Sequence, residues 1–482
     1  MNRRRFLARV AGAAIGAAGM HLLGRMAGAA ETERPPNILF ILCDDLGWGD
    51  LRCYGHTVIR TPNLDRLAAQ GTLFTQFYVN SAVCSPSRTA FMTGQYPARH
   101  GIHGHLARPE LNANRGMPNW LDPKAAAVPR LLQQAGYKTA HFGKWHLGSG
   151  AGAPGPSAYG IDVHRTLNSA GPGYEEEQKA PYFRARSTGL FVDDALEFIE
   201  AAGDRPWYVN LWTLVPHATL HPTEEDMKPY RRLAPAARLP YKGALQIYYG
   251  TVTALDRDLG RLLARLDELG QAENTVVVFS SDNGPEDIHI RNAVHSGVGS
   301  PGPFRGRKRS LYEGGIRMPL IVRWPGHVPA GRVETEAVLT AVDFLPTVCR
   351  LAGAAVPDGY AGDGEDVSDI LLGKSRPRTR PIFWEWRFRV HGYTIHRPPM
   401  LAVRDGPWKL LMNPDRSRVE LYHVPSDPSE VDNRASAHPE VVERLAGPLL
   451  AWQKTLPEGR VEDAAGKRGY RWPAPQTGGT AR

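Results

Sequence analysis

Short apolar runs alternate with helical patterns over most of the chain, and this alternation limits the possible fold more than any other feature of the sequence. The clearest run, residues 37–42, begins after Pro36 and ends just before Asp44. Such a run is typical of a parallel strand that is buried on both faces. The same reasoning predicts strands at residues 137–142, 207–212, 275–280 and 319–324, and helices at residues 61–71, 128–135, 190–202, 241–269 and 343–351. Strands joined by helices in this order predict an α/β fold with a large mixed, mostly parallel sheet sandwiched by helices.

The pattern changes after about residue 376. Residues 381–386, 401–404 and 408–412 predict short strands, Asp405-Gly406 is a hairpin signal, and residues 438–452 predict a closing helix that is kinked or broken at Gly447-Pro448. We therefore expect an α/β domain over residues 36–375, and a small C-terminal antiparallel sheet plus helix over residues 376–460. Residues 149–180 are expected to form a long loop, and residues 461–482 a flexible tail.

The first residues are typical of an export signal. Arg3-Arg4-Arg5 precedes Phe6-Leu7 and an Ala/Gly-rich stretch, which predicts a signal peptide of twin-arginine type over residues 1–29, with a plain Sec signal as the alternative. The stretch is too short for a transmembrane helix and no other long apolar run follows, so we do not expect the protein to span a membrane. We expect a bacterial, periplasmic or secreted protein that uses the twin-arginine export machinery.

Charge and cysteine content exclude further classes. The formal charge is +9, but residues 1–29 carry five arginines and no acid, so the remainder carries only +4 and nucleic-acid binding is disfavoured. The four cysteines are scattered without the spacing of a disulfide framework. Cys43 and Cys349 lie in apolar patterns and are expected to be core thiols. Cys84 differs, because it opens a polar turn that leads into a short helix ending at Gly94.

Two pairs of oxygen-bearing side chains follow predicted strands. Asp44-Asp45 comes directly after the first strand, and Asp282-Asn283-Gly284 follows the strand at 275–280. Each pair alone is also what a turn or helix cap requires. However, ligands bind beyond the carboxyl ends of the strands in open α/β sheets, and adjacent acids in a cleft repel one another without a cation. The two pairs together predict one site for a divalent cation such as Ca²⁺.

The segment from Cys84 to Arg88, Cys-x-Pro-x-Arg, resembles the signature of the sulfatases in the alkaline-phosphatase-like superfamily. Further motifs follow the order of that family, and the resemblance extends from about Pro36 to Trp452. These motifs are Thr93–Pro97 with Arg99-His100-Gly101, Gly143–Gly148, Pro216-His217, Asp282–Gly284, Gly306–Lys308, Glu313–Pro319, Arg404–Lys409 and Glu420–Tyr422.

The resemblance implies a sulfuric ester hydrolase in which a maturation enzyme converts Cys84 to formylglycine. One hydroxyl of the hydrated aldehyde would attack sulfur, and the second would allow sulfate to leave. The resemblance also implies that Asp44, Asp45, Asp282, Asn283 and position 84 hold one Ca²⁺, with Mg²⁺ less favoured. It implies that Arg88 and Lys144 hold the diol oxygens, that His146 is the base, and that His217 and Lys308 bind the sulfate ester and protonate the leaving alcohol. His221 competes with His217 for that role.

Residues 299–313 resemble N-acetylgalactosamine-6-sulfatase-like members, so a sulfated saccharide is the expected substrate, with aryl sulfates as surrogates. The side chains expected to line an anionic sugar subsite are Arg305, Arg307, Arg309, Trp386 and Arg387. Two alternatives remain open: a phosphodiester or phosphonate monoester hydrolase of the same superfamily, and an inactive protein that binds sulfated glycans.

Overall fold

The computed structural model describes residues 34–233, 243–290 and 293–470. The signal peptide predicted for residues 1–29 and the end of the predicted tail, residues 471–482, lie outside the described residues. The described residues from Pro36 onward belong to one compact unit. Every helix among the described residues is too short or too polar to cross a bilayer.

The main sheet has nine strands in the order β4-β3-β5-β1-β6-β7-β2-β8, with β9 paired to β2. All neighbouring strands are parallel except the two pairs that include β7, so β7 alone runs against the others. The predicted mixed, mostly parallel sheet is confirmed. The strands are β1 Asn37–Asp44, β2 Thr72–Tyr78, β3 Lys138–Lys144, β4 Val163–Leu167, β5 Trp207–Pro216, β6 Thr275–Ser281, β7 Arg317–Arg323, β8 Arg332–Glu334 and β9 Leu339–Thr340.

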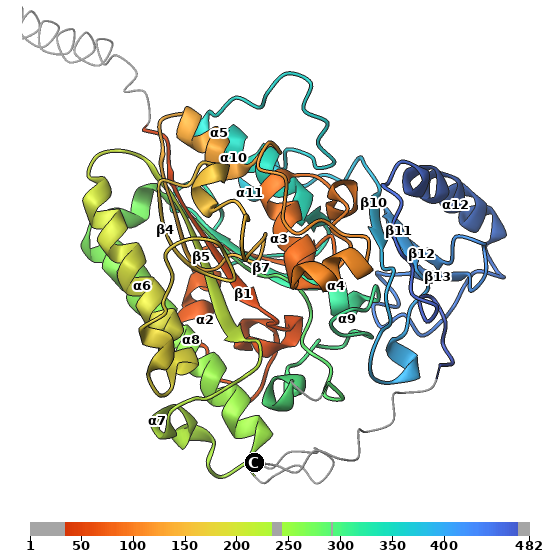
Figure 1. Cartoon of the computed structure of the whole chain (residues 1–482), viewed down its shortest axis with the longest axis horizontal. Coiled ribbons are helices and arrows are strands. Elements are labelled where there is room, and N and C mark those ends of the chain that lie inside the picture. Colours follow the sequence, from red (N-terminus) through yellow and green to blue (C-terminus); the bar gives the residue numbers. More distant parts are fainter. Residues whose placement is uncertain (1–33, 234–242, 291–292, 471–482) are drawn as a thin grey trace, which may run out of the picture. The chain divides into compact units, whose positions relative to one another are not determined.

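Helices cover both faces of this sheet (Figure 1). Strand β1 shows why, because its side chains alternate between two cores. Phe40 packs against Phe91 and Phe344 at ring-centroid distances of 4.9 and 4.4 Å, whereas Leu39 and Ile41 belong to the core on the opposite face. The first core includes α3 Cys84–Thr93, α5 Val128–Gln134 and α10 Phe344–Ala352, and the second includes α2 Pro62–Ala69, α6 Phe183–Ala202 and α8 Ala244–Glu268. The shorter helices are α4 Pro109–Asn114, α7 Glu224–Met227, α9 Glu313–Ile316 and α11 Ser368–Leu371.

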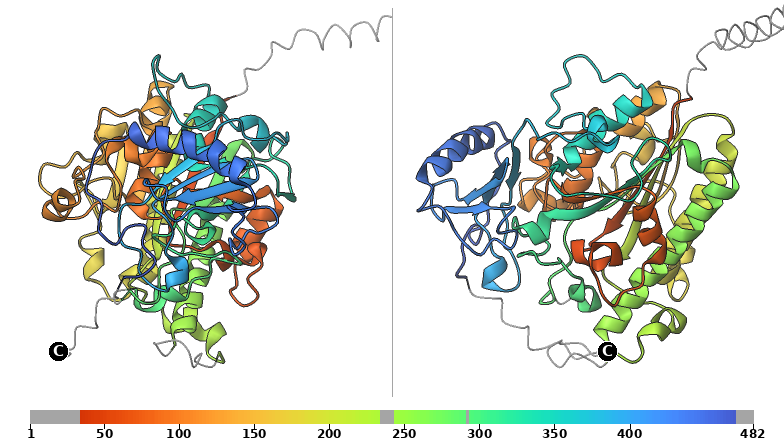
Figure 2. Two further views of the ribbon diagram at one scale, coloured as in Figure 1. Left: turned by 90° about the vertical axis from the view of Figure 1, so that its right-hand side faces the viewer. Right: turned by 180° about the vertical axis from the view of Figure 1, so that it is seen from behind.

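The C-terminal sheet is an antiparallel meander with α12 Pro439–Lys454 packed on it (Figure 2). Its strands are β10 Ile382–Glu385, β11 Leu401–Asp405, β12 Trp408–Met412 and β13 Glu420–His423. The predicted hairpin is confirmed, since Gly406 lies in the turn between β11 and β12 with a φ of 56°. Of the kink or break predicted at Gly447-Pro448, the break is wrong, because α12 continues through Pro448, and the kink stays a prediction. Both residues are exposed, so water can satisfy the carbonyl that the proline leaves unbonded.

Two further predictions need correction. The expected loop at 149–180 contains β4, which pairs in parallel with β3 and forms one edge of the main sheet. Residues 461–470, expected to begin a flexible tail, pack on the fold: Ala464 and Ala465 are buried, and the Glu462 backbone N–H donates to the Arg387 carbonyl at 2.9 Å. Two small apolar residues at the end of a polar segment were too short a pattern to predict this packing.

Candidate active site

The two acidic segments meet because β1 and β6 are neighbouring parallel strands. Cys43 lies opposite Ser281, so the residues that follow each strand emerge at the same edge of the sheet. The Asp45 backbone N–H donates to Asp282 Oδ1 at 3.1 Å, and Asn283 Nδ2 donates to Asp45 Oδ1 at 2.7 Å. Asp45 has a φ of 67°, a left-handed conformation in which Asp is enriched. The structure therefore brings these side chains together at one sheet edge, as the sequence predicts, and the cation site itself stays a prediction.

Helix α3 brings Cys84 to this edge. Cys84 is its first residue, and Arg88 lies one turn later on the same face. Ligand atoms of Asp44, Cys84 and Asp282 lie within 4.8 Å of one another. Arg88 donates from Nε and Nη2 to Asp282 Oδ2 at 3.0 and 2.7 Å, and from Nη1 to the Lys144 carbonyl at 3.0 Å. The thiol and the guanidinium are therefore held against the acids by one buried helix.

Two lysines from other elements complete the cluster. Lys144, the last residue of β3, donates from Nζ to Asp44 Oδ2 at 2.7 Å. Lys308, in the segment before α9, donates to both oxygens of Asp45 at 2.6 and 2.8 Å. Both lysines are buried. Charged groups from five segments of the chain therefore meet beyond the strand ends.

Burial and neighbouring charges shift the pKa values of Asp44 and Asp282 in opposite directions. Burial alone would raise the pKa of Asp44, but Lys144, His217 and Arg88 hold it well below its usual value. Burial and the charge of Asp44 raise the pKa of Asp282 well above its usual value despite Arg88. Asp44 Oδ1 and Asn283 Oδ1 are buried without a hydrogen-bond partner. A divalent cation would use both oxygens and stabilise the ionised form of Asp282, so the donor set fits a hard cation.

The two histidines are held in defined orientations. The ring of His146 contacts the Leu106 carbonyl through Nε2 at 3.0 Å, which leaves Nδ1 buried and unpartnered. Burial and the charges of Lys144 and Arg88 lower the pKa of His146 well below its usual value, so Nδ1 is free to accept a proton.

His217 follows the last residue of β5, and its Nε2 lies 3.8 Å from Asp45 Oδ2. Its Nδ1 contacts the Ala218 carbonyl at 2.6 Å. Burial, with the charge of Lys308, lowers the pKa of His217 to about 4. The competing candidate, His221, is exposed and lies against the ring of Tyr182 instead.

Two residues at the site escaped the sequence prediction. Glu286 lies 3.7 Å from Lys308 Nζ and pairs with Arg309. Its position three residues after Asn283 was the one available signal. Arg184, on α6, donates from Nη2 to the His217 carbonyl at 2.7 Å. Nothing in the local sequence separates it from Arg186, the other arginine of that helix.

Only two of the five side chains expected at an anionic sugar subsite line one cavity. Arg309 and Trp386 line a common cavity, but three other members have structural contacts instead. Arg305 donates to the carbonyls of Ile395 and Glu430, Arg307 to those of Glu286, Gly297 and Gly299, and Arg387 to Glu385 Oε2. An arginine in the sequence does not show whether its guanidinium is free to bind a ligand or already donates hydrogen bonds to backbone carbonyls.

Comparison with known proteins places this geometry in a family. The family model described as Sulfatase matches residues 36–354, and the model described as N-sulphoglucosamine sulphohydrolase, C-terminal, matches residues 304–454. The chain is 36% identical to N-acetylgalactosamine-6-sulfatase of Canis lupus familiaris over 388 residues, or 74% of this chain and 70% of that protein. It is 33% identical to arylsulfatase A of Homo sapiens over 413 residues, or 80% of this chain and 77% of that protein.

A solved structure agrees with the sequence comparison. The crystal structure of Ps i-CgsB in complex with k-i-k-neocarrahexaose superposes with a TM-score of 0.74 and 27% identity, covering 88% of this chain and 94% of that one. The fold around the strand-end cluster is thus shared with a relative over nearly its whole length. The family model alone covers well over half of the chain. The chain belongs to the sulfatase family and is a sulfuric ester hydrolase.

Proposed function

We propose that the protein removes sulfate from a sulfated carbohydrate of the N-acetylgalactosamine-6-sulfate type, and from aryl sulfates, with formylglycine at position 84 and one Ca²⁺. The observation that carries the proposal is the cluster of Asp44, Cys84 and Asp282, whose ligand atoms lie within 4.8 Å of one another. Asp44 Oδ1 and Asn283 Oδ1 are unpartnered beside it. Asp44, Asp45, Asp282 and Asn283 would hold the metal ion, which would supply positive charge for the sulfate oxygens and for the group at 84. The aldehyde would supply, once hydrated, the nucleophilic hydroxyl.

The surrounding cations are suited to an anionic ester. Burial would lower the pKa of Lys308, but Asp45 and Glu286 raise it above its usual value, so Lys308 stays charged. Arg88 and Lys144 donate to Asp282 and Asp44 and would hold the oxygens of position 84. Positive groups fixed before the substrate arrives stabilise a developing negative charge without reorganisation.

The histidines would divide the proton transfers. His146 would accept a proton at its unpartnered Nδ1. His217 would donate one to the leaving alcohol, which requires a protonated ring although its pKa lies at about 4. A bound anionic sulfate ester would raise that pKa, so His217 gains its proton when the substrate is present.

The names of the relatives support the substrate class. The matched proteins include an N-acetylgalactosamine-6-sulfatase and an arylsulfatase, and the solved relative was crystallised with a neocarrahexaose. The lysines argue against the phosphoester alternative. A second metal ion would need further anionic or histidine ligands, yet the ammonium groups of Lys144 and Lys308 already lie against Asp44 and Asp45.

One experiment tests these parts together. Protein is purified as precursor and as exported form, and mass spectrometry measures formylglycine at position 84 in each. We propose that the chain is exported in the folded state by the twin-arginine route, so the maturation enzyme would have to convert Cys84 before export. The aldehyde should therefore already be present in the precursor. The modified protein is then assayed for metal content and on matched sulfate and phosphate esters of one alcohol.

We expect one Ca²⁺ per chain and preferential sulfate release. Two zinc ions with faster phosphoester hydrolysis would establish the phosphodiester or phosphonate hydrolase instead. Saccharide binding without turnover in fully modified protein would establish a glycan-binding protein.

A further inference from the structure

A cavity of about 380 Å³ lies beside the candidate active site. Two of its wall residues are direct chain neighbours of candidate catalytic contacts. Arg309 follows Lys308, and His105 precedes Leu106, whose carbonyl contacts the ring of His146. A substrate with its ester at the strand ends could therefore extend into this cavity.

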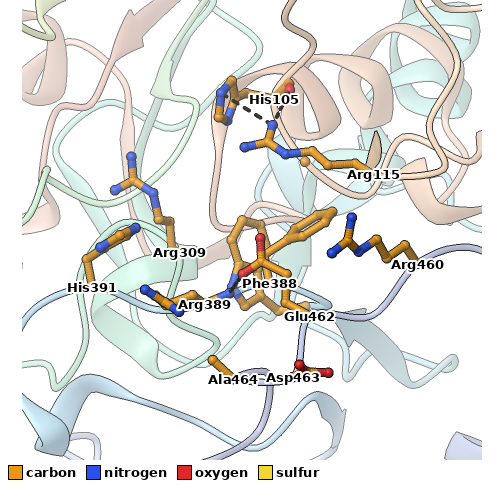
Figure 3. Close-up of a pocket in the computed structure, with 12 residues that line it drawn as sticks. His105, Arg115, Arg309, Phe388, Arg389, His391, Arg460, Glu462, Asp463 and Ala464 are labelled. Atoms are coloured by element: carbon orange, nitrogen blue, oxygen red, sulfur yellow. Dashed lines mark hydrogen bonds between the residues drawn. The ribbon is translucent and has the colours of Figure 1, made fainter. Parts of the chain in front are cut away.

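Arginines approach the cavity from several sides (Figure 3), and they differ in how far they are neutralised. Arg309 is paired with Glu286. By contrast, no carboxylate among the described residues lies within ion-pair distance of the guanidinium groups of Arg115, Arg389 or Arg460. Arg115 donates to the His105 carbonyl at 3.3 Å, and Arg460 donates to the Asn114 carbonyl at 3.1 Å. Arg389 Nε is buried without a hydrogen-bond partner, and the guanidinium of Arg389 lies over the ring of Tyr470 at 5.3 Å.

The remaining walls suit a sugar ring more than a free inorganic anion. Trp386 is 3% exposed and its Nε1 has no hydrogen-bond partner, and Phe388 lies beneath the guanidinium of Arg115 at 5.4 Å. Aromatic faces give a saccharide an apolar surface. Glu462 and Asp463 also line the cavity and can accept hydrogen bonds from hydroxyl groups.

One wall comes from the segment that the sequence predicted to be a tail. Glu462 is fixed by its backbone N–H to the Arg387 carbonyl and by its carboxylate, which accepts from the Arg389 backbone N–H at 2.8 Å. The burial of Ala464 and Ala465 anchors the segment on its far side. Arg460 therefore reaches the cavity from a segment with a defined path.

We propose that this cavity binds a second anionic group, a carboxylate or a sulfate, on the saccharide whose sulfate ester is cleaved. The proposal rests on the proposed function and narrows its substrate class to saccharides with at least two negative charges. Guanidinium groups bind carboxylates and sulfates through paired charge-assisted hydrogen bonds, which are stronger than neutral ones. Arg115, Arg389 and Arg460 would supply these bonds.

The test compares Arg460→Gln and Arg115→Gln with the unchanged protein, all with formylglycine verified at position 84. The substrates are an aryl sulfate, a sulfated disaccharide with a neutral neighbouring sugar, one with a uronic acid neighbour, and one with a second sulfate. Loss of one charge-assisted contact should lower the ratio of kcat/KM for charged over neutral disaccharide by about tenfold or more. The disaccharide with the uronic acid and the one with the second sulfate are assayed separately. The substrate whose kcat/KM ratio falls further in the variants identifies the anionic group that the cavity binds.

Arg350→Gln is the matched control, because this arginine is 75% exposed on α10 and away from the cavity. It should leave the ratio unchanged. Arg460 is exposed, so its variant is expected to fold, and its Tm checks this. An unchanged protein that does not prefer charged disaccharides, or arginine variants that keep the preference, would overturn the cavity proposal while leaving sulfatase activity intact. Failure of the unchanged protein to hydrolyse any sulfate ester would instead overturn the proposed function.

Discussion

Two buried charge clusters use the same residue types for different purposes. The active-site cluster lies at the ends of β1 and β6 and comprises Asp44, Asp45, Arg88, Lys144, Asp282 and Lys308. The junction cluster lies between the main sheet and the C-terminal sheet and comprises Glu313, Arg317, Lys409, Glu430 and Tyr78. Both are almost completely excluded from water, so both require their charges to be balanced.

The clusters differ in whether every buried side-chain oxygen has a close polar partner. In the junction cluster, Lys409 Nζ lies 2.9 Å from an oxygen of Glu313 and from one of Glu430. The remaining oxygens accept from the Tyr78 hydroxyl at 2.5 Å and from the Glu313 backbone N–H at 2.6 Å. Glu430 Oε1 accepts no hydrogen bond by geometry, but the Lys409 ammonium lies against it. At the active-site cluster, Asp44 Oδ1 and the neighbouring Asn283 Oδ1 also accept no hydrogen bond, and the ion pair of Asp44 Oδ1 with Arg88 Nη2 is 3.8 Å long. A complete cluster stabilises the fold, whereas an incomplete one at strand ends is prepared for a ligand.

The largest expected effect is on turnover in the active-site cluster. Cys84→Ser removes the group that we propose becomes formylglycine, so sulfate release should fall by a factor on the order of 10⁴ or more. The free energy of unfolding, measured in urea, should change by less than about 1 kcal/mol, because serine is nearly isosteric.

Cys349→Ser is the matched control for this variant. Its thiol is buried in the apolar core, so a hydroxyl there should cost about 1–3 kcal/mol of stability and leave turnover per folded molecule intact. Equal turnover in Cys84→Ser and the unchanged enzyme would remove position 84 from the chemistry.

The second effect is on stability in the junction cluster. Lys409→Met leaves Glu313 and Glu430 buried beside each other without their common partner, and should cost about 3–5 kcal/mol in urea unfolding. Turnover per folded molecule should stay within about twofold. Lys374→Met, at an exposed position, provides the control. A stable Lys409→Met protein with impaired turnover would show that this cluster also serves catalysis.

The sequence predicts the active-site cluster better than the junction cluster, and the reason is local. Asp44-Asp45 and Asp282-Asn283 each follow a recognisable strand, so adjacency of two parallel strands is enough to unite them. Glu313, Lys409 and Glu430 meet only because the second sheet packs against α9, which no local pattern specifies. The same limit applies to Arg460, whose contact with the cavity depends on the path of residues 461–470.

A third, graded effect concerns His217. If its ring donates a proton to the leaving oxygen, His217→Ala should reduce turnover of sugar sulfates about 10- to 100-fold more than that of activated aryl sulfates. Good leaving groups need little proton donation, so the ratio of the two kcat/KM values reports the role. His221→Ala is the control because its side chain is exposed and stacks on Tyr182. Equal losses on both substrates, or a larger split in His221→Ala, would assign the proton donation elsewhere.

The smallest effect is a pH dependence of stability in the junction cluster. Burial raises the pKa of Glu430 to about 7, although Lys409 opposes the shift. Between its ordinary value near 4.5 and about 7, the folded protein keeps a proton that the unfolded chain has released. The contribution of Glu430 to stability should therefore fall as pH rises through this window, by about 1–2 kcal/mol because Lys409 and Glu313 share the titration.

Urea unfolding between pH 4.5 and 7.5 measures this decline. Asp50, whose pKa burial raises to about 6, adds a slope of the same sign, whereas His141 and His217, whose pKa values burial lowers to about 3 and about 4, add slopes of the opposite sign. The informative quantity is therefore the difference between the unchanged protein and Glu430→Gln. Glu430→Gln should lose part of the slope, and Glu443→Gln, an exposed partner of Arg416, should keep all of it. If Glu430→Gln retains the full slope, Glu430 is ionised throughout the window, and the two carboxylates of the junction cluster are then balanced by Lys409 and Arg317 without a bound proton.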